Sequence, residues 1–389
     1  MNYDFESYLS RKGTGSYKWV RLENLDAKIL PFDAADMEFR TSPEIIARLE
    51  ELARFGEWGY TMPTEKYKKA VVDWMKNHHN YEIKPEWIVN TFGIVPSIHT
   101  AVKTFTEPGD EVIVQPPVYG PFYAAITAYD RVITKNNLIE KDGYYYIDFE
   151  DLEEKAKTAK MMILCSPHNP VGRVWTREEI TRIVEICKKH DVFLYSDENH
   201  QDLVMKPNVH TPVLALGIDY DKIIVGTSAA KTFSLASLSC SNIIIPNDEI
   251  RNKFFTAIMK DGYYFMNVFG VNATEAAYTK GEPWMNELLE YIQGNYEFFK
   301  SYLKEKMPDA YVYPLEGTYL IWIDFRKYFG TDAAAIADFM SESIAIVDNG
   351  TDFGPEGAGF VRFAIATPRW AIQDVIDRMY ETAKKRGLV

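Results

Sequence analysis

The sequence predicts an α/β fold in which helices cover both faces of a mixed, mostly parallel sheet, followed by a smaller α+β domain. Short apolar runs alternate with helical patterns through the middle of the chain, as they do in parallel sheets. After about residue 285 the pattern changes to one long helix and shorter, half-apolar strands. A chain of 389 residues is also long for a single core, so two domains are expected.

The larger domain comes first, and its strands and one helix can be recognised in order. The predicted strands are Trp87–Thr91, Glu111–Val114, Met161–Leu164, Val192–Tyr195 and Lys222–Val225. Thr176 and Glu179 have the spacing of a capping box, which begins a helix. Apolar residues then recur at helical spacing at Ile180, Ile183, Val184 and Cys187.

The smaller domain has its own elements. A long helix is predicted over Trp284–Lys306, and a last helix from about Trp370. Three short strands are predicted between them, at Ala310–Pro314, Tyr319–Asp324 and Phe360–Ala364.

Composition narrows the class of protein. The formal net charge of −13 argues against nucleic acid as a partner, because phosphate binding needs concentrated Lys and Arg. The N-terminal residues lack the pattern of a signal peptide, and no apolar run reaches the roughly 20 residues that span a bilayer. Cys165, Cys187 and Cys240 lie in apolar stretches without metal-type spacing. We therefore expect a reduced, cytoplasmic protein that binds neither a membrane nor a metal ion.

Three polar residues each come shortly after a predicted strand: Asn169, Asp197 and Lys231. In open parallel sheets, ligands bind beyond the carboxyl ends of the strands. An amine bonds covalently to an aldehyde, a carboxylate keeps a pyridine nitrogen protonated, and an amide donates to a phenolic oxygen. Together the three residues predict a site for pyridoxal 5′-phosphate.

The phosphate of that cofactor would need backbone N–H groups at a helix start and a hydroxyl donor. Gly93, Ile94 and Val95 open a helical pattern after a predicted strand, and Gly93 permits close approach of the ligand. Ser228, three residues before Lys231, is the expected hydroxyl donor.

These residues belong to a longer series of segments that resembles one family. The series contains Lys18-Trp19, Ala35-Asp36-Met37-Glu38-Phe39, Gly59-Tyr60-Thr61, Pro116-Pro117-Val118-Tyr119, the segments around Asn169, Asp197 and Lys231, Glu316-Gly317-Thr318-Tyr319-Leu320, and Gly359-Phe360-Val361-Arg362. In this order they resemble the fold-type I pyridoxal phosphate enzymes of the class I/II aminotransferase superfamily. Within it, the chain is most similar to the MalY/PatB branch of cystathionine β-lyases, or C–S lyases.

The resemblance implies the seven-stranded sheet of the pyridoxal phosphate-dependent transferase fold. It also implies domain bounds: an N-terminal arm over 1–45 that joins the small domain, a large cofactor-binding domain over 46–284, and a small C-terminal domain over 285–389.

The resemblance assigns roles to further residues. Tyr119 would stack on the cofactor, and Arg362 would hold the substrate α-carboxylate in a bidentate fork. Tyr60 matches a tyrosine that relatives lend to the neighbouring subunit's phosphate, so a homodimer with a shared active site is expected. His200 either braces Asp197, lies beside the cofactor ring, or is an ordinary packed histidine.

Two positions depart from the family pattern. Asp33 stands where relatives usually have Trp, near the expected substrate pocket, and Ala364 stands where they usually have Asn. An ionised Asp33 would attract a distal ammonium group on the substrate. The alternative is that Asp33 pairs with a nearby Arg or caps a turn.

The predicted function is α,β-elimination on a β-thio-substituted L-amino acid, such as cystathionine or cysteine, giving a thiol, pyruvate and ammonia. Lys231 would remove the α-proton, and Lys231 or Tyr119 would protonate the leaving sulfur. An aminotransferase that uses the same cofactor residues is the first alternative. A regulatory or sensor protein built on this fold is the second, and the acidic composition disfavours the DNA-binding form of it.

Overall fold

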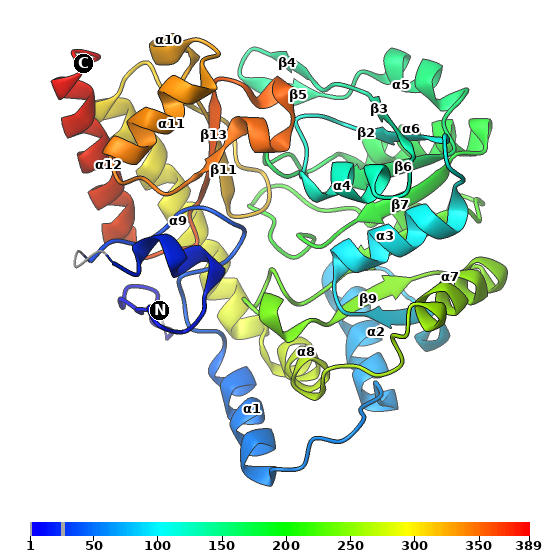
Figure 1. Ribbon diagram of the computed structural model, residues 1–389. Coiled ribbons are helices and arrows are strands. Elements are labelled where there is room, and N and C mark those ends of the chain that lie inside the picture. The colour runs from blue at the N-terminus through cyan, green and yellow to red at the C-terminus, as the bar shows by residue number, and fades with distance from the viewer. Residues whose placement is uncertain (1, 25–27) are drawn as a thin grey trace.

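A computed structural model describes residues 2–24 and 28–389, and its largest element is a seven-stranded sheet (Figure 1). The strand order is β1-β9-β8-β7-β6-β2-β3. The strands are β1 (Ile88–Thr91), β2 (Glu111–Val114), β3 (Val132–Lys135), β6 (Met161–Cys165), β7 (Phe193–Asp197), β8 (Ile223–Thr227) and β9 (Ser241–Ile244). In this sheet β9 pairs antiparallel with both neighbours, and the other pairs are parallel. The predicted mixed, mostly parallel sheet is confirmed.

Side chains of the central strands alternate between two separate cores, one on each face of the sheet. Met161 and Ile163 of β6 pack into one core, and Met162 and Leu164 pack into the other. The first core is closed by α3 (Ile94–Phe105), α4 (Pro121–Thr127) and α7 (Asp248–Lys260). The second is closed by α1 (Pro43–Phe55), α2 (Glu65–His79), α5 (Phe149–Ala156), α6 (Arg177–His190) and α8 (Val268–Lys280). Helices therefore cover both faces, and α6 begins with both hydrogen bonds of the predicted capping box.

A smaller antiparallel sheet packs against the long helix α9 (Glu282–Lys306), where the ring centroids of Phe299 and Phe363 lie 5.3 Å apart; Figure 1 shows both elements. Its order is β10-β11-β13-β12, and its strands are β10 (Tyr311–Val312), β11 (Leu320–Asp324), β12 (Asp348–Asn349) and β13 (Phe360–Ala364). The helices α10 (Arg326–Phe329), α11 (Ala333–Glu342) and α12 (Arg369–Lys385) complete this part. A separate hairpin joins β4 (Ile139–Lys141) to β5 (Tyr144–Tyr146).

Several predicted bounds need correction. The helix α9 begins two residues earlier than predicted, because Pro283 occupies its first turn, where the missing N–H costs nothing. The strand predicted over Ala310–Pro314 is reduced to β10, and β12 was not predicted because two residues carry no periodicity. The domain bounds themselves stay a prediction, and residues 1 and 25–27 of the predicted arm lie outside the described part.

No helix among the described residues is both long and apolar enough to cross a membrane.

The N-terminal arm is fixed near the carboxyl end of the large sheet by a buried cluster of charges. The Glu38 carboxylate accepts from Lys18 Nζ at 3.1 Å and from Arg11 Nη2 at 3.0 Å, and its other oxygen accepts from Trp19 Nε1 at 2.9 Å. Lys18 also donates to the backbone oxygen of Asp36 at 2.9 Å. Because Lys18 and Glu38 are both buried, each charge depends on the other.

Replacing Glu38 should therefore destabilise the protein strongly. Glu38→Ala leaves the Lys18 ammonium buried without its carboxylate, and we expect a loss of about 3–5 kcal/mol in the free energy of unfolding. Urea denaturation followed by circular dichroism measures it. As a control, Glu50→Ala breaks an exposed pair with Arg54 and should cost less than about 1 kcal/mol. Equal losses in the two variants would contradict this account of the cluster.

Candidate active site

The ends of β6, β7 and β8 open into a cavity that is closed on another side by the start of α3. Nine of the residues predicted from the sequence line it: Gly93, Ile94, Val95, Tyr119, Asn169, Asp197, His200, Ser228 and Lys231. Segments far apart in the chain are brought together here because parallel strands end at the same edge of a sheet. Most of the predicted site residues therefore lie around this one cavity.

Lys231 lies four residues after the end of β8, and its Nζ donates to the backbone oxygen of Ala35 at 2.8 Å. Burial lowers the pKa of Lys231 to about 8, and the neighbouring positive charge of Arg362 acts in the same direction. Asp36 and Asp197 oppose part of this shift. A substantial share of the amine is therefore neutral near pH 8, as a nucleophile or a base requires.

Asp197 is the last residue of β7 and is buried. Its Oδ1 accepts from the backbone N–H of Asn199 at 3.1 Å. Burial raises the pKa of Asp197 to about 7, although the Asn199 N–H and the Lys231 ammonium both favour the charged form. No ion pair joins Asp197 to a cation within residues 2–24 and 28–389. A buried carboxylate of this kind suits a cationic ring nitrogen brought by a ligand.

The amide of Asn169 is oriented by its neighbour. Its Oδ1 accepts from Arg362 Nη1 at 2.8 Å, so the amide NH₂ remains to donate elsewhere. Arg362 does not itself line the cavity, but this hydrogen bond joins its guanidinium to Asn169, which does. The predicted carboxylate-binding and ring-binding residues are thus in contact.

Two of the predicted residues at the cavity, Tyr119 and His200, carry aromatic rings. Tyr119 is half-buried and packs edge-on against Phe122, with ring centroids 5.6 Å apart. Burial raises the pKa of Tyr119 to about 12, with a smaller contribution from Asp197, so its hydroxyl stays protonated at neutral pH. His200 lies 6.0 Å from the Tyr319 ring, and burial holds its pKa well below the usual value. Its Nδ1 is buried without a hydrogen-bond partner, and its role beside Asp197 or the ring stays a prediction.

The start of α3 and Ser228 form the other end of the cavity. Gly93 caps α3, and the first backbone N–H groups of this 12-residue helix have no partner within the helix. Ser228 Oγ hydrogen-bonds Asn199 Oδ1 and accepts from the backbone N–H of Ala230 at 3.2 Å. Asn199 lines the same cavity and was not predicted as a site residue, although it lies only two residues after Asp197.

Besides Arg362, two predicted residues, Tyr60 and Asp33, are not among those that line this cavity. Tyr60 is 88% exposed, and its ring stacks on Phe265 at 4.5 Å. Asp33 is buried; its Oδ2 lies 3.9 Å from Arg21 Nη1, and its Oδ1 has no hydrogen-bond partner. Burial raises the pKa of Asp33 to about 6. The Arg21 contact agrees with the alternative interpretation that Asp33 pairs with an arginine, and its substrate role stays a prediction.

The set of donors fits pyridoxal 5′-phosphate. A lysine with a depressed pKa, a buried carboxylate without a cation, an amide with free N–H groups and an open helix start lie around one cavity. Each matches one functional group of that cofactor: the aldehyde, the ring nitrogen, the phenolic oxygen and the phosphate.

Comparison with known proteins identifies the family of this chain. A model of the family "Aminotransferase class I and II" matches residues 24–379. The chain belongs to this family. Members similar to it include the cystathionine beta-lyase PatB of Bacillus subtilis, 41% identical over 97% of this chain and 99% of that protein. The protein MalY of Escherichia coli is 29% identical over 94% of this chain and 95% of that protein.

Solved structures of family members superpose over almost the whole chain. Cystalysin from Treponema denticola, which contains pyridoxal 5′-phosphate, is 40% identical, with a TM-score of 0.94 over 99% of this chain and 100% of that one. A pyridoxal phosphate-bound C–S lyase from Staphylococcus hominis is 30% identical, with a TM-score of 0.91 over 98% of both chains. The resemblance to the class I/II aminotransferases and to the PatB and MalY proteins is thus confirmed.

The depressed pKa of Lys231 predicts an unusual labelling profile. In the folded protein without cofactor, acetylation of Lys231 by acetic anhydride should rise with pH and reach half its maximum near pH 8, because the neutral amine reacts. In urea-unfolded protein the same residue should reach half-maximum near its ordinary value of 10.5. Mass spectrometry of the Lys231 peptide measures both. The same midpoint in the folded and unfolded protein would contradict the proposed environment.

Proposed function

We propose that this protein is a pyridoxal phosphate-dependent C–S lyase that eliminates a thiol from the β-carbon of an L-amino acid such as cystathionine. The end-to-end similarity to a cystathionine beta-lyase, with an intact cavity around Lys231, is the observation that carries the proposal. The products are the thiol, pyruvate and ammonia. Three free, buried cysteines are consistent with a cytoplasmic location, which we also propose.

Each cofactor-binding residue has a proposed partner on the cofactor. Lys231 would bond to the aldehyde, Asp197 would pair with the ring nitrogen, and Asn169 would donate to the phenolic oxygen. The N–H groups of Ile94 and Val95 and the Ser228 hydroxyl would receive the phosphate. Gly93 would leave room for it, Tyr119 would stack on the ring, and His200 would lie beside the ring. When bound, the cofactor withdraws electrons from the substrate Cα, which acidifies the Cα–H bond.

The remaining residues of the chain handle the substrate and its protons. Arg362 binds the α-carboxylate and fixes the direction of the Cα–H bond. The neutral amine of Lys231 accepts the α-proton, as its pKa of about 8 allows. The Cβ–S bond breaks with its electron pair on sulfur, and Tyr119, whose pKa is about 12, is protonated and donates to the leaving thiolate. Water then hydrolyses the unsaturated amino acid to pyruvate and ammonia.

The first test is the reaction itself. The purified holoenzyme with cystathionine should release pyruvate, detected by coupled oxidation of NADH with lactate dehydrogenase, and Lys231→Ala should lose nearly all of this activity. The aminotransferase alternative comes from the family model that matches the chain, which is described as aminotransferase class I and II. It predicts glutamate formation from 2-oxoglutarate and an amino-acid donor. Formation of glutamate without pyruvate would contradict the lyase proposal and support the aminotransferase alternative.

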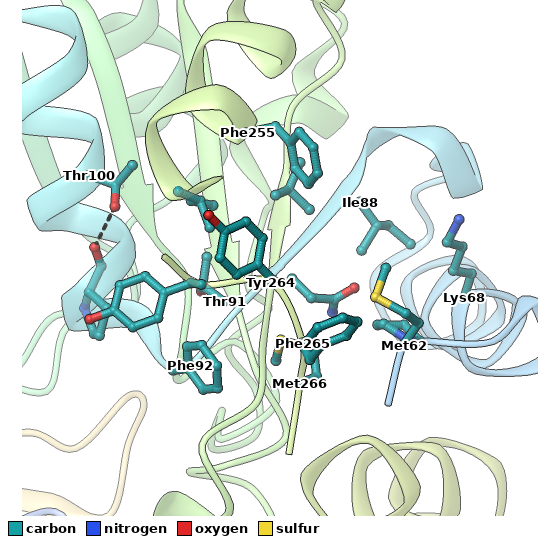
Figure 2. Close-up of a pocket in the computed structure, with 16 residues that line it drawn as sticks. Met62, Lys68, Ile88, Thr91, Phe92, Thr100, Phe255, Tyr264, Phe265 and Met266 are labelled. Carbon is teal, nitrogen blue, oxygen red and sulfur yellow. Dashed lines mark hydrogen bonds between the residues drawn. The ribbon is translucent and has the colours of Figure 1, made fainter. Parts of the chain in front are cut away.

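We further propose that the active unit is a homodimer in which Tyr60 completes the partner's site. Tyr60 is exposed beside an apolar cavity of about 230 Å³, around which Figure 2 shows Met62, Tyr264 and Phe265. That cavity shares Phe92 and Pro96 with the cavity around Lys231. A second copy seated on this apolar surface would bring its own residues to the edge of the active site.

Mixing two defective variants tests the shared site. Tyr60→Phe and Lys231→Ala protomers are each expected to be poorly active alone. A heterodimer of the two contains one site with both residues intact, so subunit exchange should restore partial activity. The control is each variant carried separately through the same exchange. Absence of recovery, with heterodimers demonstrated by native mass spectrometry, would count against a shared site.

A further inference from the structure

Arg362 of β13 lies directly opposite Asp348 of β12 in the small sheet. Both Nε and Nη2 of Arg362 donate to a single oxygen, Asp348 Oδ2, at 3.0 and 2.5 Å. Arg362 is buried, whereas the side chain of Asp348 is 22% exposed. The Asp348 carboxylate therefore binds one edge of the guanidinium and supplies the negative charge that a buried arginine needs.

The donors of Arg362 are used only in part. A guanidinium has five N–H donors. Asp348 accepts from two of them and Asn169 accepts from a third, on Nη1. Five minus three leaves two N–H groups, one on each terminal nitrogen, with no hydrogen bond to the described residues. A bidentate carboxylate accepts from two N–H groups on neighbouring nitrogens.

An aromatic ring holds the flat face of the same group. The Cζ atom of Arg362 lies 4.6 Å from the centre of the Phe353 ring. Between Asp348 and Phe353 the chain forms a short 3-10 helix, closed by reciprocal hydrogen bonds between Asn349 and Asp352. One short segment, residues 348–353, thus contacts both the edge and the face of the guanidinium.

The same segment is tied to the loop that carries Tyr119. The backbone oxygen of Phe353 accepts from the Val118 N–H at 2.9 Å and from the Tyr123 hydroxyl at 3.1 Å. Phe353 is buried, so these hydrogen bonds are shielded from water. Displacement of the segment would therefore disturb Arg362 and the neighbour of Tyr119 together.

We propose that Asp348 is a positioning residue for the substrate carboxylate: it does not touch the substrate, but it fixes Arg362 with two donors left free for it. The proposal rests on the proposed role of Arg362. Competition between Asp348 and the substrate is the opposite interpretation. It is disfavoured because Asp348 uses one oxygen on one edge and leaves a donor on both terminal nitrogens.

A pair of ligands that differ only in the carboxylate gives a readout other than turnover. 2-Aminoisobutyrate carries an α-amino and an α-carboxylate group but no Cα–H, so it binds without reacting further. tert-Butylamine has a methyl group in place of the carboxylate and likewise lacks a Cα–H. Titration of the holoenzyme with each, followed by the change in cofactor absorbance, gives the ratio of the two dissociation constants. This ratio reports carboxylate recognition alone.

We expect Asp348→Ala to reduce the wild-type preference for 2-aminoisobutyrate by roughly tenfold or more, with little change for tert-butylamine. Asp348→Glu should restore most of the preference, because it retains the charge and the acceptor. Asp352→Asn is the matched control: it removes a charge from the same segment, keeps an acceptor for the Asn349 N–H, and has no hydrogen bond to Arg362. It should bind like the wild type.

The outcomes separate the two proposals. An unchanged or increased preference in Asp348→Ala would overturn the positioning role while leaving the lyase proposal intact. Equal losses in Asp348→Ala and Asp352→Asn would also overturn it, because the effect would then be one of charge alone. If the wild type shows no preference for 2-aminoisobutyrate, both proposals fail. Should Asp348→Ala not fold, Asp348→Asn, which keeps one acceptor oxygen, takes its place and should show a partial loss.

Discussion

The register of three parallel strands is the constraint on which the site depends. Cys165 of β6 lies opposite Asp197 of β7, and Asp197 lies opposite Gly226 of β8. Because neighbouring strands lie about 4.8 Å apart, the segments that follow them leave the sheet side by side. A shift of one residue in β7 would exchange the side chains facing the two cores and move the Asp197 carboxylate to the other face. Burial of both faces makes such a shift costly, so the fold itself keeps Asn169, Asp197 and Lys231 together.

Desolvation acts on the two central ionisable groups in opposite directions. It raises the pKa of Asp197 to about 7 and lowers that of Lys231 to about 8, so each is moved towards its neutral form. Neither group forms an ion pair with another of the described residues, and Lys231 donates only to a backbone oxygen. A ligand that brings a cation to Asp197 and an electrophile to Lys231 offsets the free-energy cost of burying these two groups. The cavity therefore favours the cofactor through its electrostatics as well as its hydrogen bonds.

Sequence predicted those parts of the fold and site that depend on local patterns. The capping box of α6, the strand Phe360–Ala364 and the position of Lys231 after a buried strand each follow from a few consecutive residues. The role of Asp348 was not predictable in this way, because β12 has two residues and its partner Arg362 is 14 positions away. The burial of Lys18 beneath Glu38, and the hydrogen bond between Ser228 and Asn199, likewise arise from tertiary contacts that no periodicity reports.

The protonation states of Lys231 and Tyr119 bear on the choice between lyase and aminotransferase. Transfer of an amino group requires one amine that moves a proton between two carbons. Elimination also benefits from an acid that protonates the leaving sulfur while the base holds the α-proton. Burial moves the pKa values of the two side chains as elimination requires. Lys231, with a pKa of about 8, is partly neutral and can act as the base, and Tyr119, with a pKa of about 12, stays protonated and can act as the acid. The hydrogen bond from the Val118 N–H to the Phe353 oxygen adds a geometric condition, because it joins a segment in contact with Arg362 to the residue next to Tyr119. In the proposed reaction, binding of the carboxylate and protonation of the leaving sulfur would therefore depend on one piece of backbone, which would tie the orientation of the substrate to the position of the acid.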